Sequence, residues 1–278
     1  MSPIIDLHIH TSVSDGLSSP SEVLDMVRER ELAAFSITDH DTLDGYHAVG
    51  ELLSPEDPEL IVGVELSVLI EGSDLHLLAY LFDPDDETFN TSLTTFQKER
   101  DRRGRLITEK LGKLGLELPY DAVLESAGNS VVGRPHIAEA LHRLKLTASY
   151  NEAFQKYIGK DGPAYVPKAK MTPEEAIRLI HNAGGVAVMA HPLLDNMIRY
   201  LEQLVDFGLD GIEVYHYTTA DNDIRHIKRL AKRYKLVLSG GSDYHGRGGR
   251  TESIGSQPVP VDYLFRLKER AAKIRGEH

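Results

Sequence analysis

Nine side chains able to bind a divalent cation stand out in this sequence, because each lies within or shortly after a short apolar run. They are His8, His10, Asp15, His40, Glu65, His76, His191, Asp243 and His245. Imidazole nitrogens and carboxylate oxygens are ligands that Mn, Fe and Zn all accept, and the chain has no cysteine to supply a thiolate. The pattern predicts a metal centre made of histidine and carboxylate side chains.

The first pair of these residues lies in the segment Ile4–Gly16. His8 and His10 are two positions apart, so in a strand both side chains point to the same face, and Asp15 follows in the next loop. Taken alone, the pair is equally consistent with two hydrogen-bonded histidines in a polar strand end. The whole set favours a metal centre, because all nine residues fall at predicted strand ends. In a barrel of βα units those ends meet on one face.

The elements that must position these residues are strands alternating with helices. The predicted strands are the opening segment that carries His8 and His10, residues 33–41, Leu60–Ile70, Asp74–Phe82, Val186–Ala190, Gly211–Tyr215 and Leu236–Ser239. Helices are expected to begin at Ser19–Glu22 and Thr172–Glu175, where a capping hydroxyl precedes a proline and a glutamate. This alternation predicts parallel βα units.

Residues 83–164 have a different pattern. Four helices are expected there, over residues 90–115, Pro119–Ala127, Pro135–Leu144 and Tyr150–Ile158, and no strand stands out. We therefore predict a helical subdomain, residues 83–164, inserted into a barrel domain made of residues 1–82 and 165–278. The basic run Arg100–Arg105 is interpreted as a solvated helix face.

Composition narrows the classes of function. The 31 Lys and Arg and 43 Asp and Glu give a net charge of −12, which argues against binding duplex nucleic acid through a broad basic surface. No apolar run approaches the roughly 20 residues of a membrane-spanning helix, and the first residues lack the basic-then-apolar order of a signal peptide. We expect a cytoplasmic protein that does not bind membranes; its oligomeric state stays open.

Six short motifs, HIH, TDHD, GVELS, LHLLAY, AHP and SDYHG, occur in this order. Together they resemble the PHP (polymerase and histidinol phosphatase) family, over about Ser2–Phe82 and Tyr165–Gly255. Within that family the chain is similar to members with a helical insert that hydrolyse 3′,5′-nucleoside bisphosphates or short oligoribonucleotides. The resemblance implies an α/β fold, a distorted (β/α)7 barrel, and two or three divalent ions of Mn, Fe or Zn.

The resemblance also implies how the ligands are shared. One ion would be held by His8, His10, Glu65 and Asp243, a second by Asp15, His40 and His245, and a third by His76 and His191 with Glu65 bridging. A hydroxide held through Asp15, His40, Glu65, His191, Asp243 and His245 would then attack a phosphomonoester.

Residues expected to contact the substrate lie outside this set. Arg134 precedes Pro135 at a predicted helix start, and its guanidinium could hold a phosphate through two hydrogen bonds. His216 and Lys168 are further candidates, followed by Arg247 and Arg250. The expected substrate is a small phosphorylated molecule, either a nucleotide or a short RNA.

Three alternatives to a nucleotide phosphoesterase fit the sequence less well. A histidinol-phosphate-type phosphatase needs only one phosphate contact, and the insert with Arg134 favours the nucleotide. A non-catalytic PHP scaffold of the kind attached to DNA polymerases would lack ligands, whereas here all nine positions are filled. An amidohydrolase on the same barrel would usually need a carboxylated lysine or a different histidine set.

Overall fold

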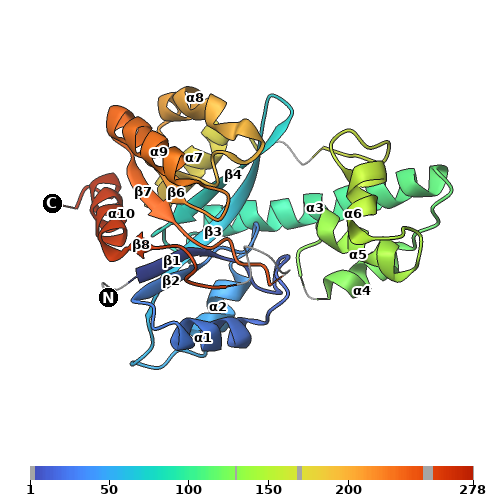
Figure 1. The fold of residues 1–278 in the computed structure, drawn as a ribbon, viewed down its shortest axis with the longest axis horizontal. Coiled ribbons are helices and arrows are strands. Elements are labelled where there is room, and N and C mark those ends of the chain that lie inside the picture. The colour runs from blue at the N-terminus through green and yellow to red at the C-terminus, as the bar shows by residue number, and fades with distance from the viewer. Residues whose placement is uncertain (1–3, 129, 168–170, 247–252, 278) are drawn as a thin grey trace.

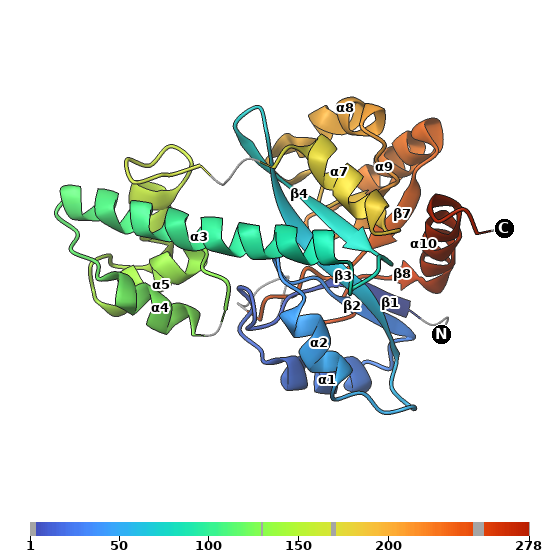
Figure 2. The same cartoon turned by 180° about the vertical axis from the view of Figure 1, so that it is seen from behind.

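The computed structural model describes residues 4–128, 130–167, 171–246 and 253–277. The candidates Lys168, Arg247 and Arg250 lie outside these described residues. A sheet that curls towards a barrel forms the body of the molecule, and a lobe of helices extends from one side of it (Figure 1). The view from behind shows one long helix, α3 (Glu87–Lys113), running from the body into the lobe (Figure 2).

The strands of the body form one sheet in the order β7-β6-β5-β4-β3-β2-β1-β8. Their bounds are β1 (Ile4–Ile9), β2 (Ala34–Ile37), β3 (Glu59–Ile70), β4 (Ser73–Tyr80), β5 (Val186–Met189), β6 (Gly211–Tyr215), β7 (Val237–Gly240) and β8 (Val259–Pro260). Apolar side chains from several of these strands, among them Leu7, Leu78 and Val188, are fully buried together. A distorted barrel is therefore confirmed.

The predicted parallel βα units account for most of the sheet, but β4 and the short edge strand β8 pair antiparallel with their neighbours. Pairs β1–β2, β2–β3, β5–β6 and β6–β7 are parallel, but β4 runs antiparallel to both β3 and β5. Only Glu71 and Gly72 separate β3 from β4, and so short a connection forms a hairpin, whereas a parallel pair needs a crossover of a dozen or more residues. His76 consequently lies towards the start of β4, which is the same end of the sheet as the ends of the parallel strands.

The chain that follows β7 returns to β1. The Asp243 N–H donates to the His8 carbonyl at 2.9 Å, and the His10 N–H donates to the Tyr244 carbonyl at 3.0 Å. A Cβ on Gly241 would overlap the Cβ and the backbone nitrogen of His8. Only glycine allows this approach, which joins the first and last ligand-bearing segments.

Helices cover the outside of the sheet. They are α1 (Pro20–Glu29), α2 (Asp44–Gly50), α7 (Pro173–Asn182), a 3-10 turn η2 (Leu194–Tyr200), α8 (Leu201–Asp206), α9 (Asp221–Tyr234) and α10 (Val261–Ile274). The two predicted capping boxes are confirmed. Ser19 and Glu22 cap α1, and Thr172 and Glu175 cap α7, each hydroxyl accepting from a backbone N–H of the first turn.

The lobe has its own apolar core. It contains the far half of α3 with α4 (Tyr120–Ala127), α5 (Arg134–Arg143), α6 (Tyr150–Ala153) and a π-helical turn η1 (Phe154–Ile158). Ile107 and Leu111 of α3 are buried in this core, whereas Phe89 and Leu93 of the same helix are buried against the barrel. One helix thus connects both cores, and the boundaries predicted at 82/83 and 164/165 stay a prediction.

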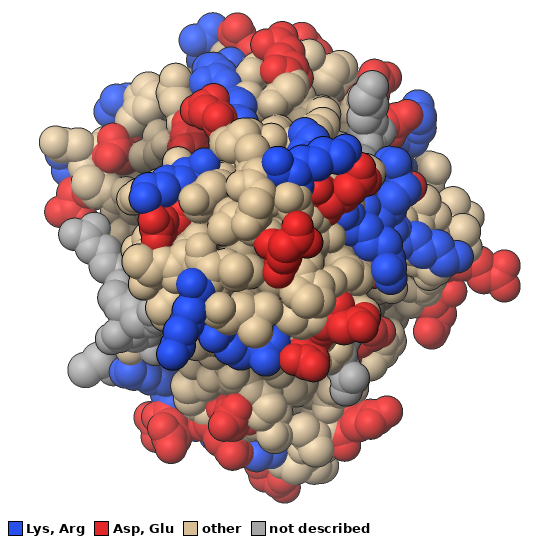
Figure 3. All heavy atoms as spheres, turned by 90° about the vertical axis from the view of Figure 1, so that its right-hand side faces the viewer, with Lys and Arg blue, Asp and Glu red and all other residues tan. Residues whose placement is uncertain are grey.

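The surface at the lobe end carries charges of both signs. In Figure 3, Lys and Arg side chains form small groups separated by Asp, Glu and uncharged residues. None of the helices described here has both the length and the apolar character that crossing a bilayer requires.

Candidate metal centre

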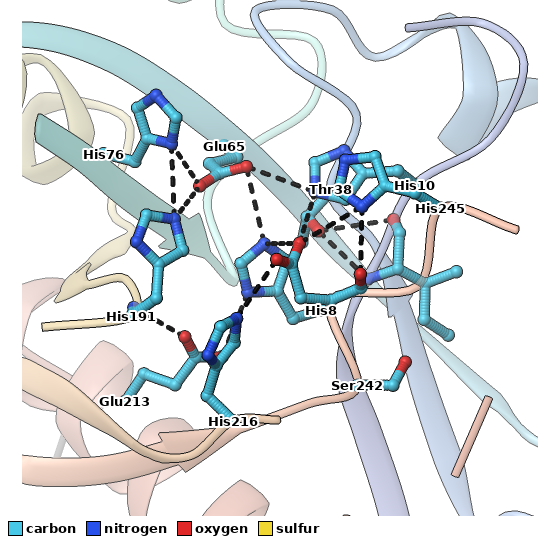
Figure 4. A network of polar contacts seen from close by, with 12 residues as sticks. His8, His10, Thr38, Glu65, His76, His191, Glu213, His216, Ser242 and His245 are labelled. Atoms are coloured by element: carbon cyan, nitrogen blue, oxygen red, sulfur yellow. Dashed lines mark hydrogen bonds and ion pairs between the residues drawn. The ribbon is translucent and has the colours of Figure 1, made fainter. Parts of the chain in front are cut away.

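The nine predicted ligand residues lie together at one end of the barrel. Glu65 is at their centre, with His76 and His191 on one side of it and His8, His10 and His245 on the other (Figure 4). Its Oε2 lies 3.4 Å from His8 Nε2 and 3.2 Å from His10 Nε2. Its Oε1 lies 2.9 Å from both His76 Nδ1 and His191 Nε2. One carboxylate therefore faces two separate groups of imidazoles.

Two aspartates, Asp243 and Asp15, complete the cluster beside His8, His10 and His245. Asp243 Oδ1 lies 3.3 Å from the Nε2 atoms of both His8 and His10. Asp15 Oδ1 lies 3.2 Å from His245 Nε2, and His40 Nδ1 lies 3.3 Å from Glu65 Oε2. All nine residues are thus joined by contacts between an imidazole nitrogen and a carboxylate oxygen.

The spacing of these ligand atoms and their imidazole nitrogens without hydrogen bonds both fit bound divalent cations. His8 Nε2, both nitrogens of His10 and His40 Nδ1 are buried, and none of them forms a hydrogen bond with a residue that the structure describes. Two ligands about 2.1 Å from a tetrahedral ion are separated by roughly 3.4 Å, close to the nitrogen–oxygen separations found here. Buried polar atoms normally have partners, so a cation between the ligands accounts for both observations.

The grouping of the ligands differs in detail from the division implied by family resemblance. Potential ligand atoms within 4.8 Å of one another form three sets: His10, Asp15, His40 and His245; His8, His10 and Asp243; and His40, Glu65 and His76. His10 and His40 each belong to two sets, whereas the resemblance assigns each of them to one ion. His191 still contacts Glu65, and its Nε2 lies 3.3 Å from His76 Nδ1.

The charges of the cluster are strongly coupled. Burial raises the pKa of Glu65, but the imidazoles of His40, His76 and His8 outweigh this and hold that pKa well below its usual range. Burial lowers the pKa of His10, yet its contacts with Asp243 and Glu65 raise it to about 10. The carboxylates are therefore ionised and require nearby positive charge. Either protons or divalent cations supply it, and metal binding to such a set releases protons.

Two of the ligands have unusual backbone conformations. His191 and Asp243 have φ values of 26° and 53°, in the left-handed region that non-glycine residues seldom occupy. Such conformations cost free energy and persist where the surrounding structure holds them, often at functional sites. The backbone hydrogen bonds to β1 hold Asp243 in this way.

Glu213 is a functional residue that the sequence did not reveal. It lies within β6, is fully buried, and its Oε1 lies 3.0 Å from His8 Nδ1. Its Oε2 accepts the backbone N–H of His191 at 2.7 Å. A carboxylate behind a ligating histidine fixes the ring and its tautomer, so Glu213 orients two ligands at once. Its position in a polar-apolar alternating strand was the only signal in the sequence.

His216 was predicted to contact the substrate, but it is not among the residues that line the cavity. It is fully buried, its Nε2 lies 3.1 Å from Asp243 Oδ2, and its Nδ1 lies 2.7 Å from Thr218 Oγ1. It therefore stands behind a ligand, as Glu213 does. The position of His216 directly after a strand predicted this end of the barrel. It could not predict on which side of Asp243 the ring lies.

A cavity of about 270 Å³ opens beside the cluster. Asp15, His40, His76 and His191 form its barrel wall, and three arginines, Arg100, Arg103 and Arg134, form its lobe wall. The interpretation of residues 100–105 as a solvated face is therefore wrong for two of them. Arg103 is only 6% exposed, and Arg100 Nε lies 2.6 Å from Asp41 Oδ2 of the barrel.

Known proteins are similar to this chain in sequence and in fold. Residues 6–238 match the PHP domain family. The 5′-3′ exoribonuclease Rnm of Salmonella typhimurium is 34% identical over 249 residues, which is 87% of this chain and 85% of that protein. The 3′,5′-nucleoside bisphosphate phosphatase of Chromobacterium violaceum is 32% identical over 254 residues, 88% of this chain and 89% of that protein.

A solved structure from Bifidobacterium adolescentis, provisionally described as a metal-dependent phosphoesterase, has a TM-score of 0.86 with this chain. It is 28% identical, and the match covers 97% of this chain and 98% of the other. The distorted barrel, the ordered histidine motifs and these similarities agree, and the chain belongs to the PHP domain family.

Proposed function

We propose that this protein hydrolyses phosphate esters of nucleotides or short RNA, and that the cavity between Glu65 and Arg134 is where it does so. Relatives named as an exoribonuclease and a bisphosphate phosphatase, and a similar structure described as a metal-dependent phosphoesterase, support a metal-dependent phosphoesterase. The observation that carries the proposal is the pairing of two walls around one cavity: ligands for cations on the barrel and guanidiniums for anions on the lobe. A site that hydrolyses phosphate esters needs both kinds of group.

The proposed metal content is two or three divalent ions of Mn, Fe or Zn, held by the nine ligand residues. The two oxygens of Glu65, each directed at its own imidazoles, support a shared ligand. When bound, such cations polarise phosphoryl oxygens and activate water for attack on phosphorus. The protein's part is to fix the ligands, through Glu213 and His216 behind them, and to orient the ester.

Arg134 is the proposed contact to a second phosphate of the substrate. Its Nη2 lies 3.2 Å from Asp74 Oδ2, and both side chains are about one-fifth exposed at the cavity. A phosphate reaching this position would accept from the same guanidinium, which suits two parallel hydrogen bonds. Two-phosphate nucleotides are therefore the preferred substrates in this proposal.

A short RNA is the second candidate, and a neighbouring hollow favours it. This hollow has a volume of about 460 Å³ and shares Asp74, Arg134 and Phe154 with the cavity. It continues along Lys160 and Arg199, both of which donate to Ser73 Oγ. An aromatic ring with nearby cations is a common platform for single-stranded nucleic acid, so further nucleotides would extend in this direction.

The test is a phosphate-release panel on metal-loaded protein. It compares adenosine 3′,5′-bisphosphate, adenosine 3′- and 5′-monophosphates, histidinol phosphate and a short 5′-phosphorylated RNA. We expect the bisphosphate or the RNA to be turned over with the highest kcat/KM, and Asp243→Asn to lose that activity. Preference for histidinol phosphate would replace the nucleotide proposal. No turnover of any compound, with no difference from Asp243→Asn, would reject a phosphoesterase.

A further inference from the structure

Asp6 of β1 is a buried carboxylate outside the nine ligand residues. It lies two positions before His8, so its side chain points to the same side of the strand. It is only 1% exposed, and among the described residues no lysine, arginine or histidine forms an ion pair with it. A buried carboxylate needs hydrogen-bond partners, and Asp6 has them in backbone N–H groups.

The two carboxylate oxygens of Asp6 accept from different parts of the chain. Oδ1 accepts the Ser242 N–H at 2.9 Å, and Oδ2 accepts the Gly255 N–H at 2.8 Å. Oδ1 also accepts the His8 N–H at 3.3 Å. Ser242 directly precedes the ligand Asp243, and from Gly255 the chain leads to β8, which pairs with β1. One carboxylate therefore joins β1 to two stretches of the chain between β7 and β8.

The stretch that begins at Ser242 carries the last two of the nine ligands. Asp243 has a φ of 53°, a conformation that persists only where surrounding contacts hold it. The N–H groups of Ser242 and Asp243 are both bound, the first by the Asp6 carboxylate and the second by the His8 carbonyl. Gly241 allows this approach, since a Cβ there would lie 2.8 Å from Asp6 Oδ1. Asp6 thus lies where it fixes the backbone that directs Asp243.

Apolar packing also holds these stretches against the barrel. Tyr244 and Ile254 are buried in the same cluster as Ile9 of β1. The hydrophobic effect is non-directional, so this packing keeps the stretches close to β1 without setting the orientation of the backbone at Asp243. Hydrogen bonds are directional, and those to Asp6 supply the orientation.

We propose that Asp6 is a positioning residue of the metal centre, and that its two oxygens hold in place the stretch that presents Asp243 and His245 to the ions. The inference rests on the metal centre of the proposed function and adds a residue to it. An asparagine at this position would have one oxygen for two stretches of chain, and its NH2 group would face an N–H. One stretch would then be released, and the spacing of the ligands would no longer be fixed.

The test compares Asp6→Asn with wild type in two measurements on the intact chain. The first is hydrogen exchange, with and without Mn²⁺, at the N–H groups of Ser242 and Gly255. At least one of them should exchange about 10- to 100-fold faster, because a hydrogen bond to a charged group is lost. The second is Mn²⁺ affinity, measured by competition with a chelating dye, which should fall by about 10- to 100-fold.

Asp210→Asn is the matched control. Asp210 is also a buried carboxylate, 4% exposed, and it accepts the Ala187 N–H at 3.0 Å. Its loss should lower the urea midpoint but leave wild-type exchange at Ser242 and Gly255 and wild-type Mn²⁺ affinity. An equal loss of Mn²⁺ affinity in the two variants would give Asp6 a purely structural role and overturn the proposal.

The two measurements must also agree with each other. Faster exchange in Asp6→Asn with wild-type Mn²⁺ affinity, or weaker Mn²⁺ binding with wild-type exchange, would each overturn the proposal. If Asp6→Asn does not fold, Asp6→Ser decides by the same criteria, because its short side chain leaves room for water to accept from the N–H groups.

Failure of the proposed metal centre would be visible separately. If wild type binds no Mn²⁺, the metal centre is rejected, and exchange without the metal tests the role of Asp6 alone. Faster exchange at Ser242 or Gly255 in Asp6→Asn then supports the hold on this part of the chain, and equal exchange in the two proteins rejects it.

Discussion

The two walls of the cavity differ in how their charged side chains are paired. On and behind the barrel wall, five imidazoles surround the carboxylate of Glu65, and each charge has several partners. On the lobe wall, Arg100 and Arg134 each pair with one carboxylate, and Arg103 forms an ion pair with none of the described carboxylates. The barrel wall is thus suited to bound cations, and the lobe wall to an anion that enters and leaves.

The walls also differ in how they are held. The barrel wall is attached to strands of one sheet, so hydrogen bonds between strands fix its spacing. The lobe wall is carried by α3 and α5, and its distance from the metals depends on how α3 packs against the barrel. Arg100 contributes to that packing, because it joins α3 to Asp41 and to Ser67 Oγ at 2.8 Å. Predictions on each wall test this contrast.

The largest effect is expected from Glu65→Gln on the barrel wall. The amide keeps the shape but removes the charge and one of the two acceptors that five imidazoles share. Metal chemistry contributes several kcal/mol to such reactions, so phosphate release should fall by about 10³-fold, or about 4 kcal/mol. Bound metal per chain, measured by plasma mass spectrometry, should fall with it.

Glu59→Gln is the control on the same strand. Glu59 is half-exposed and pairs with Lys268 at 2.7 Å on the outside of the barrel. Its loss should change neither the metal content nor the rate. Full activity and full metal content in Glu65→Gln would show that the barrel wall does not depend on a shared carboxylate.

Arg100→Met should affect stability more than any other change to the lobe wall. It leaves the carboxylate of Asp41, only 2% exposed, without its cation. Breaking a buried pair costs about 3 kcal/mol or more, which urea unfolding would measure. Arg134→Met breaks a partly exposed pair and should cost about 1 kcal/mol or less.

A double-mutant cycle decides whether the Arg100 effect comes from this pair. Asp41→Asn combined with Arg100→Met should restore part of the lost stability, because the uncompensated charge is gone. Additive losses would mean that α3 is held to the barrel by its apolar contacts, such as Phe89 and Leu93, and not by the ion pair.

A smaller and more specific effect is expected from Glu213→Gln behind the barrel wall. The carboxylate accepts from both His8 and the His191 backbone, and an amide has only one oxygen for the two donors. Metal affinity should fall by about 10- to 100-fold, as measured by competition with a chelating dye.

Asp210→Asn separates this role from simple burial. Asp210 is also buried next to β6, where it contacts His181 at 2.7 Å and accepts from the Ala187 N–H at 3.0 Å. It lies at the other end of the strand from the metals. Its loss should reduce stability but not metal affinity, and equal losses of metal affinity in the two variants would remove Glu213 from the centre.

The barrel wall was largely predictable from the sequence and the lobe wall was not. His8 lies near the end of β1, and His40 and Asp243 follow β2 and β7. Strand ends converge wherever the strands pack into one barrel. That convergence needs no knowledge of helix packing. The direction of β4 was missed, yet His76 still reached the centre because the hairpin turned the strand round.

The lobe wall depends on which face of α3 packs inward. Arg103 and Arg102 are neighbours in a run of charged residues, and no local pattern shows that one is buried and the other exposed. The outcome depends on the position of α5 and Tyr165, which are far away in the sequence. The sequence did not reveal Glu213, and it predicted the wrong place for His216, for a similar reason. Both residues act by contacting a metal ligand, and those contacts are known only from the folded structure.

The closing contact between the segment after β7 and β1 has a consequence for synthesis. A nascent chain that ends before Asp243 already contains seven of the nine ligands, but not the backbone that pairs with His8 and His10. Contacts between such distant residues form slowly and require the intervening chain. The protein therefore completes its metal centre late, after nearly the whole barrel has left the ribosome.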